Sequence, residues 1–148
     1  MIPKFLSNGN LPQGAHETTW KQFCKRSGHT AHRGSLIKGL AVALEDLSAA
    51  GCRRVYINGS FVTAKEVPGD YDLCWSIDGV IPEKLNQAFL DFSPKGRVLM
   101  KEKYKGDLFP AEIPEGTSGK IFLDFFQTDK ITGESKGIIA IDIGGFDD

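Results

Sequence analysis

Hydrophobic residues recur at helical spacing in the first third of the chain and predict two helices there. The first begins near Thr18 and ends at Gly28, with an apolar face formed by Trp20, Phe23 and Cys24. The second covers about residues 34–50, and its apolar positions are Leu36, Ile37, Leu40, Ala43, Leu44 and Leu47. Gly51 suits the end of this helix, because glycine accepts the left-handed backbone that often follows a last turn.

Beyond the second helix, short β-prone runs alternate with turn-forming residues. Strands are predicted at 53–58 and 71–77, and a helix that starts at Pro82 is predicted from the stripe of Leu85, Phe89 and Phe92. The run 97–101 is interpreted as a strand and 106–119, with its glycines and prolines, as a surface loop. The last third is interpreted as a hairpin, with strands 121–126 and 137–143 on either side of the polar turn 129–136.

These elements predict one α+β domain, in which a mixed sheet is backed by helices on one face. The 148 residues suffice for a single hydrophobic core, and no repeat or polar linker divides them. Residues 1–17 are dense in turn formers and are interpreted as an N-terminal arm, which leaves residues 18–148 as the domain.

Composition narrows the classes of function. The chain has 18 basic and 19 acidic side chains, so no bulk field attracts nucleic acid or anionic lipid, and any phosphate site must be local. Arg26, Arg33 and Lys38 are interpreted as solvated charges near the start of the long helix rather than as an RNA path. No apolar run approaches the roughly 20 residues that cross a bilayer, and no signal-peptide pattern is present. We therefore expect a cytoplasmic protein without a membrane partner.

The most informative segment holds a Gly-Ser pair and an Asp-x-Asp pair. Gly59 and Ser60 end a predicted strand, and Asp70 and Asp72 open the next one. Because side chains alternate along a strand, the two carboxylates project from the same face, where they repel each other without a cation between them. An oxygen-only pair suits Mg²⁺, which takes its remaining ligands from water and substrate phosphates.

The other side of this segment is suited to anionic oxygens. Gly59 permits a close backbone approach, the Ser60 hydroxyl adds a donor, and a short helix is predicted over 61–66. Lys65 would add a positive charge one turn later. A metal side next to a phosphate side predicts a site for a nucleoside triphosphate.

A strand, Gly-Ser, a spacer of about ten residues and Asp-x-Asp resemble the signature of the polymerase-β-like nucleotidyltransferase superfamily. The whole chain is also similar to a family of small bacterial nucleotidyltransferase-like proteins, through segments 11–16, 59–66, 69–75, 106–111, 125–127 and 136–139. The resemblance implies a nucleotidyltransferase-like fold, metal ligation by Asp70 and Asp72, and triphosphate contact by Gly59 and Ser60. It also implies a third carboxylate on a neighbouring strand.

Asp124 is the first choice for this third carboxylate. It is the lone acid in the apolar run 121–126, where burial would be costly without a cation partner. Glu112 and Asp107 in the preceding loop are the next choices, and Asp142 is the fourth.

The activity that this resemblance implies is a Mg²⁺-dependent transfer of a nucleoside monophosphate from an NTP to a hydroxyl. The acceptor would be tRNA or a partner protein, as in similar proteins of toxin–antitoxin or phage-defence modules. Asp124 would help to deprotonate the acceptor while pyrophosphate leaves from the α-phosphorus. The alternative is a nucleotide-binding or partner-binding module that keeps the fold and catalyses nothing.

Overall fold

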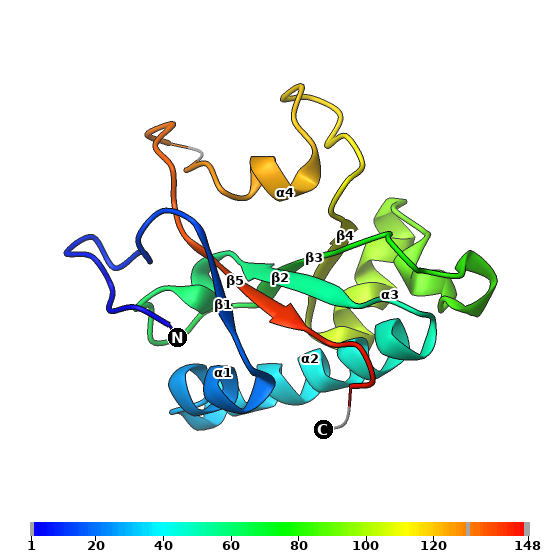
Figure 1. Ribbon diagram of the computed structural model, residues 1–148, viewed down its shortest axis with the longest axis horizontal. Coiled ribbons are helices and arrows are strands. Elements are labelled where there is room, and N and C mark those ends of the chain that lie inside the picture. Colours follow the sequence, from blue (N-terminus) through cyan, green and yellow to red (C-terminus); the bar gives the residue numbers. More distant parts are fainter. Residues whose placement is uncertain (1, 130, 147–148) are drawn as a thin grey trace.

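Five strands form one mixed sheet in the order β1-β5-β2-β3-β4 (Figure 1). The computed structural model describes residues 2–129 and 131–146. The strands are β1 (Ala15–Thr18), β2 (Arg54–Asn58), β3 (Tyr71–Trp75), β4 (Gly106–Pro110) and β5 (Ile138–Asp142). The helices are α1 (Trp20–Ser27), α2 (Ala31–Ala49), α3 (Pro94–Tyr104) and α4 (Phe122–Phe125), with short 3₁₀ turns at Ser60–Val62, Pro82–Lys84 and Gln87–Phe89. The predicted α+β class with a mixed sheet is confirmed.

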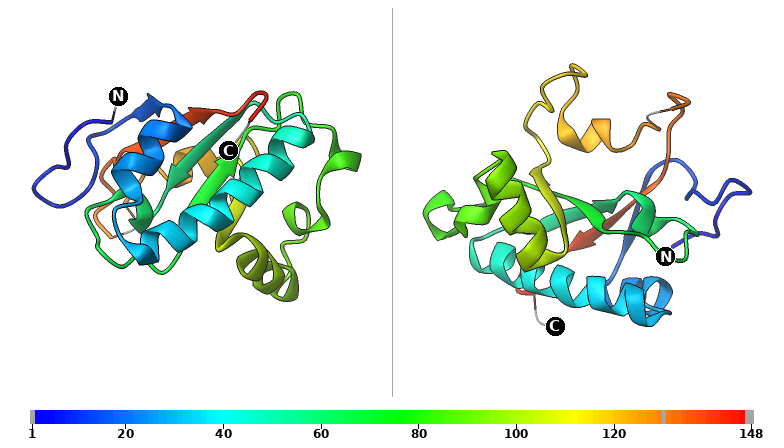
Figure 2. Two further views of the ribbon diagram at one scale, coloured as in Figure 1. Left: turned by 90° about the horizontal axis from the view of Figure 1, so that it is seen from below. Right: turned by 180° about the vertical axis from the view of Figure 1, so that it is seen from behind.

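The two faces of the sheet differ in what covers them. Helices α1 and α2 lie against one face, and α4 with its flanking loops lies over the other (Figures 1 and 2). The main core lies under α1 and α2, and it includes Leu40, Leu44 and Ile57. A smaller cluster around Cys74 and Phe126 lies on the opposite face. Most of the apolar burial thus stabilises one face, and the other is left partly open for a site.

The two predicted N-terminal helices are confirmed, and each begins at a threonine cap. The Thr19 hydroxyl accepts a hydrogen bond from the Gln22 N–H, and the Thr30 hydroxyl accepts one from the Arg33 N–H. β1 pairs in parallel with β5, so the sheet extends into the last residues of the segment interpreted as an arm.

The segment predicted as a strand at 97–101 lies instead within helix α3, so that prediction is wrong. The Ser93 hydroxyl accepts a hydrogen bond from the Gly96 N–H, and Pro94 follows at the first helical position. Met100 and Tyr104 form the buried face at helical spacing, whereas Val98 is exposed. The apolar run therefore suggested a strand, whereas its buried positions follow the period of a helix.

The segment expected to be a surface loop begins with strand β4, so this prediction is wrong over 106–110. β4 pairs in parallel with β3, and Tyr71 is opposite Gly106. A Cβ at Gly106 would lie 2.6 Å from the Tyr71 carbonyl oxygen, so glycine here permits close backbone approach. Glycine and proline thus mark a tightly packed edge strand rather than a loop.

Two further predictions of secondary structure are wrong. The run 121–126 contains the short helix α4 instead of a hairpin strand, because Phe122 and Phe126, one turn apart, both pack against Phe109. The predicted helix after Pro82 is replaced by two 3₁₀ turns separated at Asn86, which has an extended backbone and caps the second turn through its side chain. The strand predicted at 137–143 is confirmed as β5.

Candidate functional site

A row of polar side chains crosses three neighbouring strands on the face opposite α1 and α2. Asn58 ends β2, Asp72 lies near the start of β3, and Asp107 lies near the start of β4. Asn58 is paired with Asp72 in the antiparallel register, and Asp72 is paired with Asp107 in the parallel one. Directly opposed residues have their side chains on the same face, so the three polar groups lie side by side.

The Gly-Ser turn lies directly against Asp72. Gly59 has φ 81° and ψ −169°, a conformation almost restricted to glycine. A Cβ at this position would lie 2.5 Å from Asp72 Oδ2. The predicted helix 61–66 is wrong, because only a three-residue 3₁₀ turn, Ser60–Val62, follows the glycine. The turn therefore meets the carboxylate through backbone proximity and not through a helix dipole.

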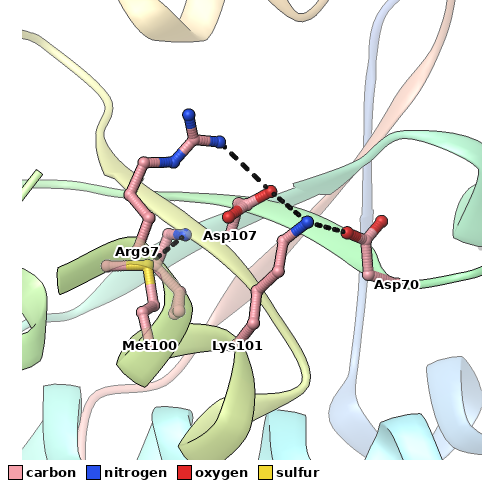
Figure 3. A network of polar contacts seen from close by, with 6 residues as sticks. Asp70, Arg97, Met100, Lys101 and Asp107 are labelled. Atoms are coloured by element: carbon pink, nitrogen blue, oxygen red, sulfur yellow. Dashed lines mark hydrogen bonds and ion pairs between the residues drawn. The ribbon is translucent and has the colours of Figure 1, made fainter. Parts of the chain in front are cut away.

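Two cations from α3 face the carboxylates. Lys101 Nζ lies 3.0 Å from Asp70 Oδ2 and 3.4 Å from Asp107 Oδ2, as Figure 3 shows. Arg97, one turn earlier on the same helix, places Nη2 3.5 Å from Asp107 Oδ2. The hydrogen bond to Asp70 raises the pKa of Lys101, so the ammonium stays charged at neutral pH. The Lys101 ammonium thus pairs with two of the three acids Asp70, Asp72 and Asp107.

The position of α3 relative to β3 is fixed by a buried tyrosine. Tyr71, between the two acids of the Asp-x-Asp pair, is fully buried, and its hydroxyl donates a hydrogen bond of 2.8 Å to the Tyr104 carbonyl at the end of α3. This bond holds the helix that carries Arg97 and Lys101 beside the strand that carries the acids.

A pocket of about 380 Å³ opens over two residues of this row, Asp72 and Asp107. Asp72, Asp107, Arg97 and Glu115 supply its polar lining, and the rest is aromatic: Phe92, Phe109, Phe122, Phe125 and Phe126. The Arg97 guanidinium also lies 5.8 Å from the centre of the Phe109 ring. The pocket therefore combines a carboxylate end with an aromatic end, and Arg97 contacts both.

Buried oxygens in the row are suited to a hard cation. Asp107 Oδ1 and Asn58 Oδ1 are buried and have no hydrogen-bond partner in the part of the chain that the structure describes. An unpaired buried oxygen is costly, and Mg²⁺ commonly takes one or two carboxylates and completes its shell with water and substrate phosphates. Among the described residues, no three His, Cys, Asp or Glu side chains are gathered as a metal centre. The donors fit a metal that arrives with a substrate rather than a closed metal cage.

Arg33, on helix α2, anchors the loop that follows the Gly-Ser turn. This arginine is 2% exposed, and its guanidinium donates to the carbonyls of Phe61, Thr63 and Lys65 at 2.7, 3.0 and 2.5 Å. Burial lowers the pKa of Arg33, but an arginine stays protonated in proteins. The prediction of a solvated Arg33 is therefore wrong: it is an internal anchor for the segment 61–65.

The structure places the predicted third carboxylates in different parts of the fold. Asp124 is exposed on α4 and does not line the pocket, and its predicted strand does not exist. Glu112 accepts hydrogen bonds from the Ser76 hydroxyl and the Ile77 N–H, beyond the far end of β3. Asp142 is paired with Arg54 at the opposite end of β2 from Asn58. Only Asp107, among these four acids, is aligned with Asp72.

The remaining predicted residues are only partly brought together. Gly59 touches Asp72, and Asp70 reaches the row through Lys101. The Lys65 side chain is exposed and does not line the pocket, while its carbonyl binds Arg33.

Sequence reasoning missed Arg97 and Lys101 on α3 and Phe109 on β4, and it named Asp107 only as an alternative to Asp124. Arg97 and Lys101 are four residues apart on a helix that the strand interpretation concealed. The signal that would have revealed the helix is Ser93-Pro94, a cap followed by the residue typical of a first helical position. Asp107 and Phe109 lie two residues apart on β4, and the glycine and proline at the ends of this strand made it resemble a loop.

Fold and site together define a small α+β domain with a pocket that is acidic at one end and aromatic at the other. Residues 3–142 match the model of the DUF6932 family, described as a family of unknown function, and the chain belongs to that family. No curated protein and no solved structure matches the chain. The resemblance to polymerase-β-like nucleotidyltransferases therefore rests on the sequence motif alone. None of the described helices is long and apolar enough to cross a membrane.

Proposed function

We propose that this protein is a Mg²⁺-dependent nucleotidyltransferase that moves a nucleoside monophosphate from an NTP to a hydroxyl group. The observation that carries the proposal is the alignment of Asp72 and Asp107 on neighbouring strands, with Gly59 directly against Asp72. Both carboxylates line one pocket, and Gly59 lies next to one of them. In this proposal Asp107 takes the role that the sequence suggested for Asp124.

Each residue of the site has a distinct task in the proposed reaction. Asp72 and Asp107 would hold Mg²⁺, which when bound neutralises phosphate charge and lowers the pKa of an attacking hydroxyl. Gly59 leaves room for the Asp72 carboxylate beside the backbone, and the Ser60 hydroxyl would donate to the polyphosphate. The buried Asp107 carboxylate, which lines the pocket, would also serve as the base toward the acceptor hydroxyl.

Arg97 and Lys101 supply the positive charge that balances the substrate. In the structure they neutralise Asp70 and Asp107. Both side chains are about half exposed, so they retain the freedom to turn from a carboxylate to a phosphate oxygen. Cations that face the leaving group stabilise the charge that develops on pyrophosphate.

The acceptor hydroxyl is proposed to belong to tRNA or to a partner protein, within a toxin–antitoxin or phage-defence module. The nearly neutral chain lacks a long basic track for nucleic acid, so a tRNA end or a protein hydroxyl suits it better than an extended duplex.

Transfer of label tests this function. The protein is incubated with Mg²⁺, an α-labelled NTP and either total tRNA or total cell protein. We expect label on one acceptor pool, dependent on Mg²⁺ and lost in Asp72→Asn. Nucleotide binding without transfer to either pool would contradict the enzymatic proposal.

The second candidate is a binding module that has kept the fold without catalysis. Its supporting observation is Lys101, whose ammonium forms ion pairs with both Asp70 and Asp107. This candidate predicts that nucleotide binding is independent of Mg²⁺, so a titration of ATP with and without the metal separates the two.

A further inference from the structure

A stack of nearly parallel phenylalanine rings forms the wall of the pocket beside the carboxylates. Phe109 lies between Phe92 and Phe122, with ring centres 6.2 and 4.7 Å away and interplanar angles of 12° and 15°. Phe126 adds a fourth ring, 5.5 Å from Phe109. These rings come from three separate segments: the loop before α3, strand β4 and the α4 region.

These rings keep an unusual amount of exposed surface for such a cluster. Phe92 is 43% exposed, and Phe109, Phe122 and Phe125 are only partly buried. The phenylalanines of the main core, Phe23, Phe61 and Phe89, are fully buried. Folding alone therefore does not explain this exposure, because it leaves apolar surface in contact with water.

The phenylalanine wall and the carboxylates lie a short distance apart along β4. Phe109 is two residues after Asp107 and projects from the same face of the sheet, about 7 Å further along the strand. Arg97 lies between the two ends, because it pairs with Asp107 and lies over the Phe109 ring. The carboxylate end and the ring end of the pocket are therefore separated along the strand by a length of about one sugar.

We infer that the phenylalanine wall binds the base of the nucleoside triphosphate. The inference rests on the proposed function, because it assigns the polyphosphate to the carboxylate end of the same pocket. Every nucleobase has a π-face that stacks on an aromatic ring, and Arg97 is positioned to contribute a cation–π contact.

Calorimetry with a matched pair of ligands tests this assignment. ATP and ribose 5-triphosphate differ only in the base, and each is titrated into the wild-type protein with Mg²⁺. Base–aromatic stacking predicts that ATP binds about 5- to 150-fold more tightly. In Phe92→Ala, which removes an exposed ring, the preference for ATP is expected to fall several-fold while the affinity for ribose 5-triphosphate stays unchanged.

Phe5→Ala is the control variant, because Phe5 is also partly exposed, packs under Arg26 and lies outside the pocket. It is expected to keep the wild-type preference. Equal binding of both ligands by the wild type overturns the base assignment but leaves the triphosphate site in place. Binding of neither ligand contradicts the proposed function itself. The wild-type comparison needs no variant, so a folding defect in Phe92→Ala does not affect this decision.

Discussion

At the scale of single residues, Gly59 joins backbone geometry to the candidate chemistry. We expect Gly59→Ala to lower the free energy of unfolding by about 1–3 kcal/mol, because alanine disfavours this backbone conformation. Its Cβ would also push against Asp72, so the affinity for Mg²⁺·ATP should fall. Urea denaturation and calorimetry measure the two effects.

Gly119→Ala is the matched control for this prediction. Gly119 also has a positive φ, of 76°, but a Cβ there would meet nothing within 4 Å. This variant should show a backbone cost without a loss of nucleotide affinity. An equal loss of affinity in both variants would contradict a specific contact between Gly59 and Asp72.

Replacing Lys101 is predicted to strengthen metal binding rather than weaken it. Its ammonium competes with any cation at Asp70 and Asp107, so Lys101→Met should strengthen the binding of Mg²⁺ or Mn²⁺ alone, by about tenfold. The same variant should weaken the binding of ATP, because a phosphate-facing charge is lost. Lys95→Met, at the start of the same helix, should change neither affinity. An unchanged metal affinity in Lys101→Met would contradict competition between the Lys101 ammonium and a bound metal ion.

The sequence was sufficient to predict part of the site at this scale. Gly59 and Asp72 belong to a local motif, and strand alternation fixes which way the acid points. The third acid could not be chosen by the same means, because its position depends on which strand pairs with β3. Asp107 is 35 residues beyond Asp72, and only the parallel register of β3 and β4 brings the two together.

At the scale of elements, Arg33 links α2 to the loop that follows the Gly-Ser turn. Arg33→Met leaves four backbone carbonyls, three of them in this loop, without their donor, so we expect it to lower the free energy of unfolding by about 2–4 kcal/mol. Lys38→Met, an exposed position on the same helix, should stay within about 0.5 kcal/mol of wild type. A similar small effect in both variants, measured by urea denaturation, would mean that the guanidinium bonds do not hold the loop.

Elements with a strong local signal were predicted correctly, and those set by tertiary contacts were not. The repeated apolar spacing of α2 and the β-prone runs of β2, β3 and β5 needed no partner to be recognised. The short run at α4 fits a strand or a helix equally well, and its contacts with Phe109 decide between them. In α3 the exposed Val98 and Leu99 hid the helical period of the buried residues.

At the scale of the whole molecule, the two faces of the sheet differ: one holds most of the core, and the other holds the candidate site. The face under α1 and α2 holds the main core, and the opposite face keeps polar and aromatic groups beneath the pocket. The domain can therefore hold repelling carboxylates close together on one face, because apolar burial on the other face stabilises the fold.

The central claim is that Asp72 and Asp107 form one site for Mg²⁺ and a nucleotide, and one titration tests it most directly. ATP is titrated by calorimetry in the presence of Mg²⁺ into wild type, Asp107→Asn and Asp124→Asn. We predict that Asp107→Asn weakens binding by about 100-fold, as expected for the loss of a metal ligand, and that Asp124→Asn binds within about twofold of wild type. Unchanged binding in Asp107→Asn, or a larger loss in Asp124→Asn, would contradict the account.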